Sequence, residues 1–154
     1  MTAIQDLYPD DYAHCYGCGR LNEHGLHVQT TWTGSEGLAI FTPRPEHTAM
    51  PGFVYGGLLA SLIDCHAIGT AAAASMHANG LQPGVDPSPR FVTAALEVRY
   101  VKPTPMGVEL VLRAIPVEIS ARKVVLKVSV TAGGVDTVLG HVVAAPIPAS
   151  MVPA

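Results

Sequence analysis

The sequence is poor in charge. Only 14% of its 154 residues are Asp, Glu, Lys or Arg, and the formal net charge is −3. Such a composition leaves no basic surface of the kind that binds nucleic acid or an anionic membrane. Because 49% of the residues are hydrophobic, a chain of this length has ample material for one core. So little charge also favours a protein that buries surface against copies of itself.

Cysteine is scarce as well. Three cysteines, an odd number, do not form the framework of a disulfide-stabilised fold. Residues 1–6 have neither the basic region nor the apolar segment of a secretion signal, so a reducing cytoplasm is the expected location. No membrane span is expected, because the longest apolar run, residues 56–76, contains Asp64 and His66 and is rich in weakly hydrophobic alanine.

The chain divides into three parts. Residues 1–25 are rich in polar and turn-forming residues and predict a surface segment, residues 26–147 predict one domain, and the proline-containing residues 148–154 predict a loose tail. Within the domain, residues 57–77 predict the one long helix, since they are rich in Leu and Ala and contain no Pro. Its apolar residues lie on almost every side, so the helix is expected to be enclosed by protein, with Gly69 packed against another backbone.

Strand patterns flank this helix on both sides. Apolar and polar residues alternate before it, around a turn at Gly34–Gly37, and again after it. The predicted strands cover residues 26–32, 38–41, 91–101, 108–119, 123–131 and 137–145. Strand runs on either side of a single helix define an α+β fold in which a curved antiparallel sheet wraps round that helix. Because such a sheet leaves edges and apolar surface, we expect an oligomer.

The segment from Met50 to Asp64 carries the strongest functional signal. Pro51-Gly52 forms a turn, and the pair Gly56-Gly57 opens the predicted helix, so its first free N–H groups and the positive end of its dipole lie where a ligand can approach closely. Asp64 follows two turns later among apolar residues, where a carboxylate needs a partner or a function. A site that stabilises anions, followed by a half-buried acid, predicts acyl chemistry.

These residues resemble a known family, the hotdog-fold acyl-CoA thioesterases, in the branch typified by the phenylacetate-pathway (PaaI-like) enzymes. The resemblance extends over nearly the whole chain, and three segments carry it. They are Pro51-Gly52-Phe53-Val54-Tyr55-Gly56-Gly57 leading to Leu62-Ile63-Asp64, Cys15-Tyr16-Gly17-Cys18-Gly19 with Asn22 and Gly25-Leu26, and the run from Val92 to Pro103. The resemblance implies a homodimer or homotetramer with active sites at the subunit interface.

The resemblance also implies roles for particular residues. The backbone at Gly56 and Gly57 polarises the thioester carbonyl, and Asp64 is the general base toward water or the nucleophile. Thr93 falls on a hydroxyl position that helps to place the water from the neighbouring subunit. The acyl-CoA is the substrate, and no cofactor beyond the coenzyme A that it carries is implied.

Several further side chains are expected to contact the substrate. Tyr55, His47 and His66 lie near the glycine pair or the acid in the sequence. Arg122 and Lys123 follow a predicted turn, and basic residues there contact coenzyme A phosphates in similar proteins; a solvated strand start is the alternative interpretation of this pair.

Two departures from the family pattern keep other functions open. Tyr55 stands where a histidine is usual before the glycine pair, and Ala49 stands where a polar residue, often Asn, is usual. Both favour a non-catalytic acyl-CoA binding module. His47 ahead of Pro51-Gly52 resembles the hotdog enoyl-CoA hydratases or dehydratases, although Asp64 lies further along the chain than the acid of that branch.

The pair Cys15 and Cys18 beside His14 has three interpretations: a metal site, a redox pair or a turn-rich surface loop. A structural zinc site needs four ligands, and the sequence has no second Cys pair. Cys65 lies on the predicted helix and is assigned to the core, out of reach of the other two. The surface loop is therefore favoured, and no metal is expected.

Overall fold

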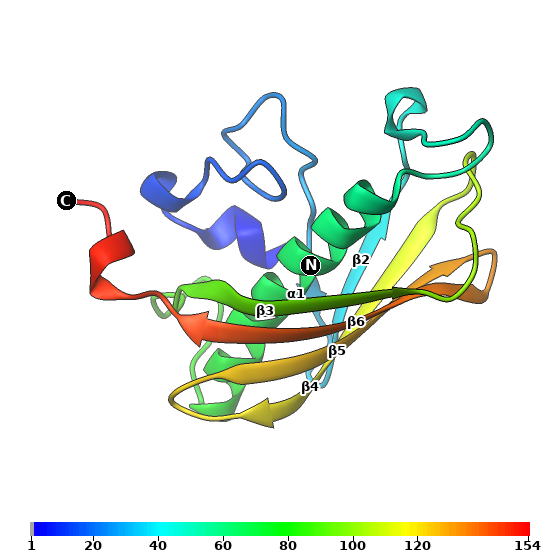
Figure 1. Ribbon diagram of the computed structural model, residues 1–154. Coiled ribbons are helices and arrows are strands. Elements are labelled where there is room, and N and C mark those ends of the chain that lie inside the picture. Colours follow the sequence, from blue (N-terminus) through cyan, green and yellow to red (C-terminus); the bar gives the residue numbers. More distant parts are fainter. Residues whose placement is uncertain (1) are drawn as a thin grey trace.

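One long helix lies across a curved antiparallel sheet in the computed structural model, which describes residues 2–154 (Figure 1). The helix is α1 (Gly56–Ala78). The strands are β1 (Thr31–Trp32), β2 (Gly37–Phe41), β3 (Phe91–Tyr100), β4 (Leu110–Ile119), β5 (Val124–Ala132) and β6 (Val135–Pro146), in the sheet order β1-β2-β4-β5-β6-β3. Every pairing is antiparallel. The predicted α+β hotdog architecture, a curved sheet wrapped round one helix, is confirmed.

Alternation along the strands directs one face of the sheet onto the helix. In β5, Val124, Leu126, Val128 and Val130 are buried while Lys127 between them is exposed, as expected for side chains that point to opposite faces in turn. Leucines and alanines of α1 complete the core from the other side. A buried leucine contributes roughly 1.5–3 kcal/mol relative to an exposed one, so this layer accounts for the helix remaining in place.

Helix α1 starts one residue earlier and ends one residue later than predicted. Its C-terminal cap is Asn79, whose N–H reaches the Ser75 carbonyl at 3.2 Å, and Gly80 follows with a φ of 68°. By length and composition alone, α1 could cross a membrane. The sequence analysis expected no membrane span here, because the run contains Asp64 and His66. Two thirds of its apolar window (67%) is buried inside the protein, which is the property of a core helix.

The predicted strand over residues 26–32 is only partly correct, because just Thr31 and Trp32 join the sheet. Leu26, Val28 and Thr30 still alternate into the core, so the periodicity was real. Their backbone bonds instead go to the N-terminal segment, as in Val28 N–H to the Gly17 carbonyl at 2.9 Å. The sequence pattern therefore indicated burial correctly and assigned the wrong hydrogen-bond partner.

The N-terminal segment lies over the side of α1 that faces away from the sheet (Figure 1, blue). Gln5 is buried, donates from Nε2 to Thr30 Oγ1 at 3.0 Å, and accepts from the Thr30 N–H at 2.8 Å. Both side chains lie against Gly69, where a Cβ would overlap the Gln5 amide. Gly69 therefore permits close packing as predicted, but against side chains rather than against another backbone.

Candidate active site

The N-terminus of α1 presents two unused backbone donors. Tyr55 is its N-cap residue, and the Leu58 N–H is already bonded to the Tyr55 carbonyl at 3.1 Å. The N–H groups of Gly56 and Gly57 have no acceptor among residues 2–154. Together with the positive end of the helix dipole, they form a site for an oxygen that carries negative charge.

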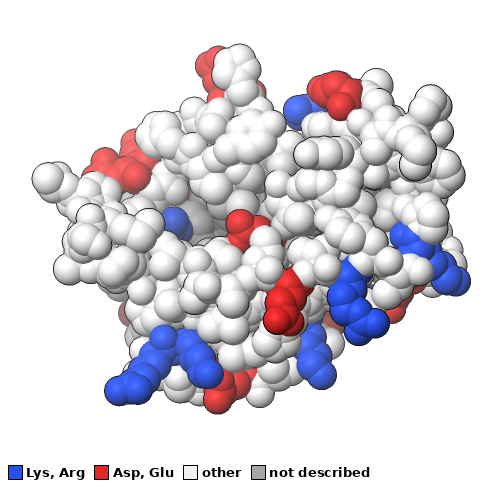
Figure 2. All heavy atoms as spheres, in the orientation of Figure 1, with Lys and Arg blue, Asp and Glu red and all other residues white. Residues whose placement is uncertain are grey.

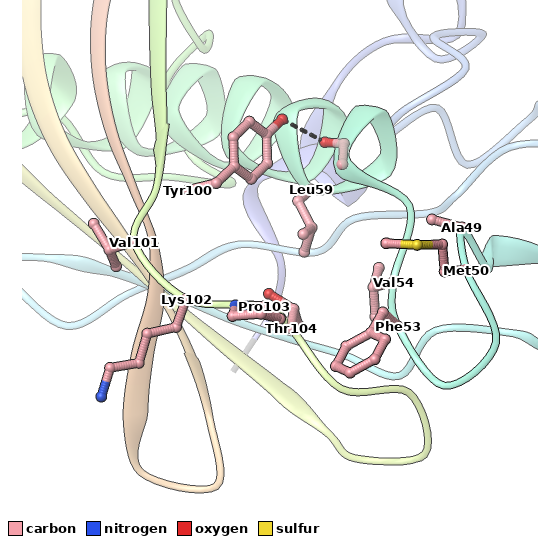
Figure 3. A pocket seen from close by; sticks show the side chains of 11 residues that line it. Ala49, Met50, Phe53, Val54, Leu59, Tyr100, Val101, Lys102, Pro103 and Thr104 are labelled. Carbon is pink, nitrogen blue, oxygen red and sulfur yellow. Dashed lines mark hydrogen bonds between the residues drawn. The ribbon is translucent and has the colours of Figure 1, made fainter.

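Two tyrosine rings lie against the glycine pair. The Tyr100 hydroxyl donates to the Gly56 carbonyl at 2.7 Å (Figure 3, dashed line), and a Cβ on Gly56 would approach the Tyr100 ring to 3.3 Å. On Gly57 a Cβ would overlap the ring of Tyr55. A side chain on Gly57 would therefore displace the Tyr55 ring, and one on Gly56 would press on the Tyr100 ring. Sequence reasoning did not single out Tyr100 as a site residue; its position at the end of the strand that carries Thr93 was the available signal.

A largely apolar cavity of about 390 Å³ opens beside this helix end. Figure 3 shows Leu59 and Tyr100 on one side and Met50 and Phe53 on the other, while the ammonium of Lys102 extends away from them. The remaining lining residues are Ala49, Val54, Gly56, Val101, Pro103 and Thr104. The cavity can hold an apolar chain next to the free N–H groups.

Asp64 lies half-buried two turns along α1. The Thr93 hydroxyl, on the edge strand β3, donates to Asp64 Oδ1 within the same chain. Burial raises the pKa of Asp64 above its ordinary value, the Thr93 hydrogen bond lowers it in part, and the nearby Cys15 raises it. One carboxylate oxygen is thus held by Thr93, and the carboxylate is more basic than an exposed aspartate.

His47 and Tyr55, both predicted to contact the substrate, lie next to each other beside the helix N-terminus. The Tyr55 N–H donates to the His47 carbonyl at 2.9 Å, and His47 Nδ1 accepts from the Arg44 N–H at 2.9 Å. Both residues line a second cavity of about 420 Å³, together with Gly57 and Ser61. Burial lowers the pKa of His47, so the imidazole is held neutral with one nitrogen already occupied.

His66 is not a substrate-contact residue, which corrects the sequence-based prediction. Its side chain is completely buried, with Nδ1 2.9 Å from Thr30 Oγ1 and Nε2 3.2 Å from the Gly37 carbonyl. Burial lowers its pKa to about 4, so it is neutral at physiological pH. The residue follows Asp64 by two positions but points into the core, since residues two apart on a helix face different directions.

Arg122 and Lys123 lie in the turn between β4 and β5. Lys123 Nζ is 3.4 Å from Glu118 Oε2, and both basic residues are exposed. The strand register places Val124 opposite Ala144, and Ala144 opposite Thr93. The turn is therefore at the same end of the sheet as Thr93, and β6 lies between its strand β5 and the strand β3 that carries Thr93. Most of the face in Figure 2 is uncharged, with basic side chains gathered along its lower margin.

The cysteines differ from the sequence-based assignment. Cys65 is half-buried rather than enclosed in the core, and its Sγ is 3.7 Å from that of Cys15. The prediction that Cys65 is out of reach was wrong because it considered the helix alone. The N-terminal segment folds onto the helix face that carries Cys65.

Helix α1, enclosed by the sheet and carrying free N–H groups at one end and an acid within it, defines the hotdog class. The thioesterase superfamily profile matches residues 51–139. A thioesterase superfamily protein from Shewanella loihica PV-4 is 44% identical, with a TM-score of 0.69 over 92% of this chain and 100% of that chain. The chain belongs to the thioesterase superfamily.

More distant structures share the fold. PaaI of E. coli, from the phenylacetic acid degradation operon, is 14% identical, with a TM-score of 0.64 over 80% of this chain and 81% of that chain. The protein smu.793 from Streptococcus mutans, solved bound to acetyl CoA, is 14% identical, with a TM-score of 0.66 over 83% of this chain and 96% of that chain. No curated protein matches the sequence.

Proposed function

We propose that the protein is an acyl-CoA thioesterase, which hydrolyses a thioester to the free acid and coenzyme A. The observation that supports this most is the pairing of two free N–H groups, at Gly56 and Gly57, with a basic, half-buried carboxylate on the same helix. The two N–H groups suit a developing oxyanion, and the Asp64 carboxylate suits activation of water.

In the proposed reaction the thioester carbonyl oxygen accepts the Gly57 N–H. Thr93 holds one oxygen of Asp64, and the other accepts a proton from the attacking water. The tetrahedral intermediate then expels the coenzyme A thiolate, which takes up a proton. If that oxygen of Asp64 attacks the carbonyl itself, an acyl–Asp64 anhydride remains after the thiolate leaves, and water then hydrolyses it to the free acid and restores the carboxylate. Removal of one oxyanion donor costs about 2.7–4 kcal/mol in other enzymes, so the Gly57 N–H would account for a large part of the rate.

A second copy of the chain is required by this proposal. Asp64 is seven positions after Gly57, which is about 10 Å along the helix, whereas a reacting carbon needs both groups within about 3 Å. The two groups of one chain therefore cannot serve the same carbonyl. We propose a homodimer or homotetramer in which Gly57 of one copy faces Asp64 and Thr93 of another.

The edge of the sheet supports such an assembly. Strand β3 is the last in the sheet order, is ten residues long, and pairs only with β6 among the described strands. Leu96 and Tyr100 on it are exposed. A long edge with apolar side chains is a template for pairing with another copy, and it carries Thr93.

The substrate would extend from the glycine pair in two directions. The apolar cavity beside Tyr100 suits the acyl chain or the pantetheine arm, and Tyr55 and His47 would border the reacting group. Arg122 and Lys123 are proposed to bind the coenzyme A phosphates, in a copy that places this turn beside the site. No cofactor is needed for the proposed hydrolysis, because the carboxylate and the backbone supply the chemistry.

Release of free thiol from acyl-CoA substrates tests the proposal. The panel covers short, long-chain and aromatic acyl groups, and the variants are Asp64→Asn and the control Asp11→Asn, which alters an exposed acid at the N-terminal surface. We expect turnover in the wild type and the control and a loss of at least 10²-fold in Asp64→Asn. Undiminished turnover in a folded Asp64→Asn variant would contradict the proposed role of the acid.

One observation favours binding without hydrolysis as a second candidate. The Tyr55 ring lies over Gly57, where the carbonyl oxygen has to dock. If the ring stays there, acyl-CoA would bind but not turn over. Calorimetric binding with no thiol release, together with turnover gained in Tyr55→His, would establish this alternative. A hydratase, by contrast, would consume the enoyl chromophore and release no thiol.

A further inference from the structure

The three cysteines of the chain converge on one point. Cys15 and Cys18 come from the N-terminal segment and Cys65 from α1, and their sulfur atoms all lie within 4.8 Å of one another. The Cys15 and Cys65 sulfurs are 3.7 Å apart. In a tetrahedral zinc site with Zn–S bonds of about 2.3 Å, neighbouring sulfurs are about 3.8 Å apart. The observed spacing therefore matches the edge of a zinc–thiolate tetrahedron.

Gly17, between Cys15 and Cys18, lets the three sulfur atoms come together. Gly17 lies directly against Cys65, and a Cβ there would overlap the Cys65 sulfur. The turn closes through the Gly19 N–H to the Cys15 carbonyl at 2.8 Å, and the Val28 N–H fixes Gly17 through its carbonyl at 2.9 Å. A glycine between the two cysteines is thus required for the third to reach them.

A positive charge lies beside the cluster. The Nε and Nη1 atoms of Arg90 are buried and have no hydrogen-bond acceptor among residues 2–154. The guanidinium carbon lies 3.9 Å from the centre of the Tyr8 ring and 4.7 Å from that of Tyr12, and its charge acts on Cys18. No described carboxylate forms an ion pair with it. Arg90 is half-buried, and its two buried nitrogen atoms lack an acceptor, so a negative group placed beside them would be stabilised.

We propose that Cys15, Cys18 and Cys65 bind one thiophilic metal ion, with zinc as the first candidate. Binding releases three thiol protons, so Zn²⁺ with three thiolates carries a net charge of −1, which the +1 of Arg90 balances. Cys15 is exposed, so a solvent molecule can take the fourth position of the tetrahedron. A disulfide between Cys15 and Cys65 is the rival use of the same atoms, but it is neutral and leaves Arg90 without a counter-charge.

The proposed metal would cross-link two segments of the chain. It would join the N-terminal segment to α1 at the residue after Asp64, and so fix both the segment and the side of the helix that carries the acid. This role does not depend on the proposed hydrolysis, because metal binding is measured without any substrate.

Titration of the reduced, metal-free protein with Cd²⁺ and Zn²⁺ tests the proposal. Cadmium–thiolate bonds absorb in the near ultraviolet, so the absorbance counts bound metal directly, and zinc competes it away. We expect one ion per chain, at least tenfold weaker binding in Cys15→Ser and Cys18→Ser, and unchanged binding in the control His14→Ala, which alters the neighbouring residue outside the cluster.

X-ray absorption on the zinc-loaded wild type covers the case in which a cysteine variant does not fold. Three sulfur ligands at about 2.3 Å are expected, whereas a spectrum of nitrogen and oxygen ligands would overturn the proposal. Binding of less than one ion per ten chains, with formation of a Cys15–Cys65 disulfide under mild peroxide, would overturn it in favour of a redox pair.

Discussion

At the scale of single residues, the candidate site depends on two opposing effects on the pKa of Asp64. Burial raises the pKa of Asp64, and the Thr93 hydroxyl partly reverses that shift. The carboxylate is therefore more basic than an exposed one, which suits a group that takes a proton from water. Thr93 therefore both positions the Asp64 carboxylate and lowers its pKa.

Replacement of Thr93 tests this tuning. Thr93→Ala removes the hydrogen bond that lowers the pKa of Asp64, so the acid limb of the rate–pH profile should move to higher pH, because more hydroxide is then needed to ionise the acid. Thr93→Ser keeps a hydroxyl and should retain the wild-type limb. The measurement is kcat/KM for thioester hydrolysis against pH. A Thr93→Ala profile with a lower maximum and an unmoved limb would show that Thr93 only positions Asp64.

His66 predicts a separate pH dependence, in stability. Its folded pKa of about 4 lies below the unfolded value of 6.5, so its contribution to stability is complete above pH 6.5 and is lost as the pH falls toward 4. At 1.36 kcal/mol per unit, up to about 3 kcal/mol of unfolding free energy disappears over this range. Urea unfolding at several pH values measures it. A His66→Asn variant should lose this part of the pH dependence, and an unchanged slope would contradict the assignment.

The sequence predicted the parts of the site that are local in the chain and missed those that are not. Gly56, Gly57 and Asp64 were identified because the turn, the helix start and the acid follow one another within one segment. Tyr100 and the contact of Cys65 with Cys15 join segments about 45–50 residues apart. His66 was misassigned because adjacency to Asp64 gives no information on which face of the helix meets Thr30.

At the scale of elements, α1 is held by packing on every side, and Gly69 shows how tightly. Alanine in place of a helical glycine gains about 1 kcal/mol in propensity, but at this position its Cβ would overlap the Gln5 amide. Overpacking of a filled core costs about 1–3 kcal/mol, and displaced Gln5 also loses its bonds to Thr30. Packing should therefore outweigh propensity.

The sign of the Gly69→Ala effect should consequently depend on residue 5. In the wild-type background we expect Gly69→Ala to lower the free energy of unfolding. In a Gln5→Ala background only the Thr30 side chain remains close, at 3.0–3.2 Å from the added Cβ, and a shift of a few tenths of an ångström accommodates it. There the same change should raise the free energy of unfolding by up to about 1 kcal/mol. Chemical unfolding of the four proteins gives both differences. The same sign in both backgrounds would show that Gln5 is not what limits the space.

At the scale of the whole molecule, the separation of Gly57 from Asp64 makes oligomerisation part of the proposed chemistry. Each site would draw its oxyanion donor from one copy and its acid from another. Two inactive variants, one damaged at each group, should then restore activity when their subunits are exchanged. A site made within one chain would gain nothing from such mixing.

The experiment mixes Asp64→Asn with Gly57→Val after dissociation and reassociation. If subunits of a dimer pair at random, half of the dimers are mixed, and one of the two sites in each mixed dimer is intact. Thiol release should therefore recover to about a quarter of the wild-type activity. Sedimentation confirms that dimers have re-formed. Re-formed dimers without recovered activity would contradict a shared site.

The buried contacts of Gln5 have a consequence for how the protein is made. Gln5 bonds to Thr30 and lies against Gly69, so the segment that carries Gln5 has no place to dock until α1 has been synthesised. The segment thus docks only after more than sixty further residues have been made, since its contact joins Gln5 to Gly69, and domains that depend on such distant contacts fold slowly. A fusion partner or affinity tag attached ahead of this segment would hinder its docking onto α1. The exposed carboxyl end, after η4 (Ala149–Met151), is the better place for one.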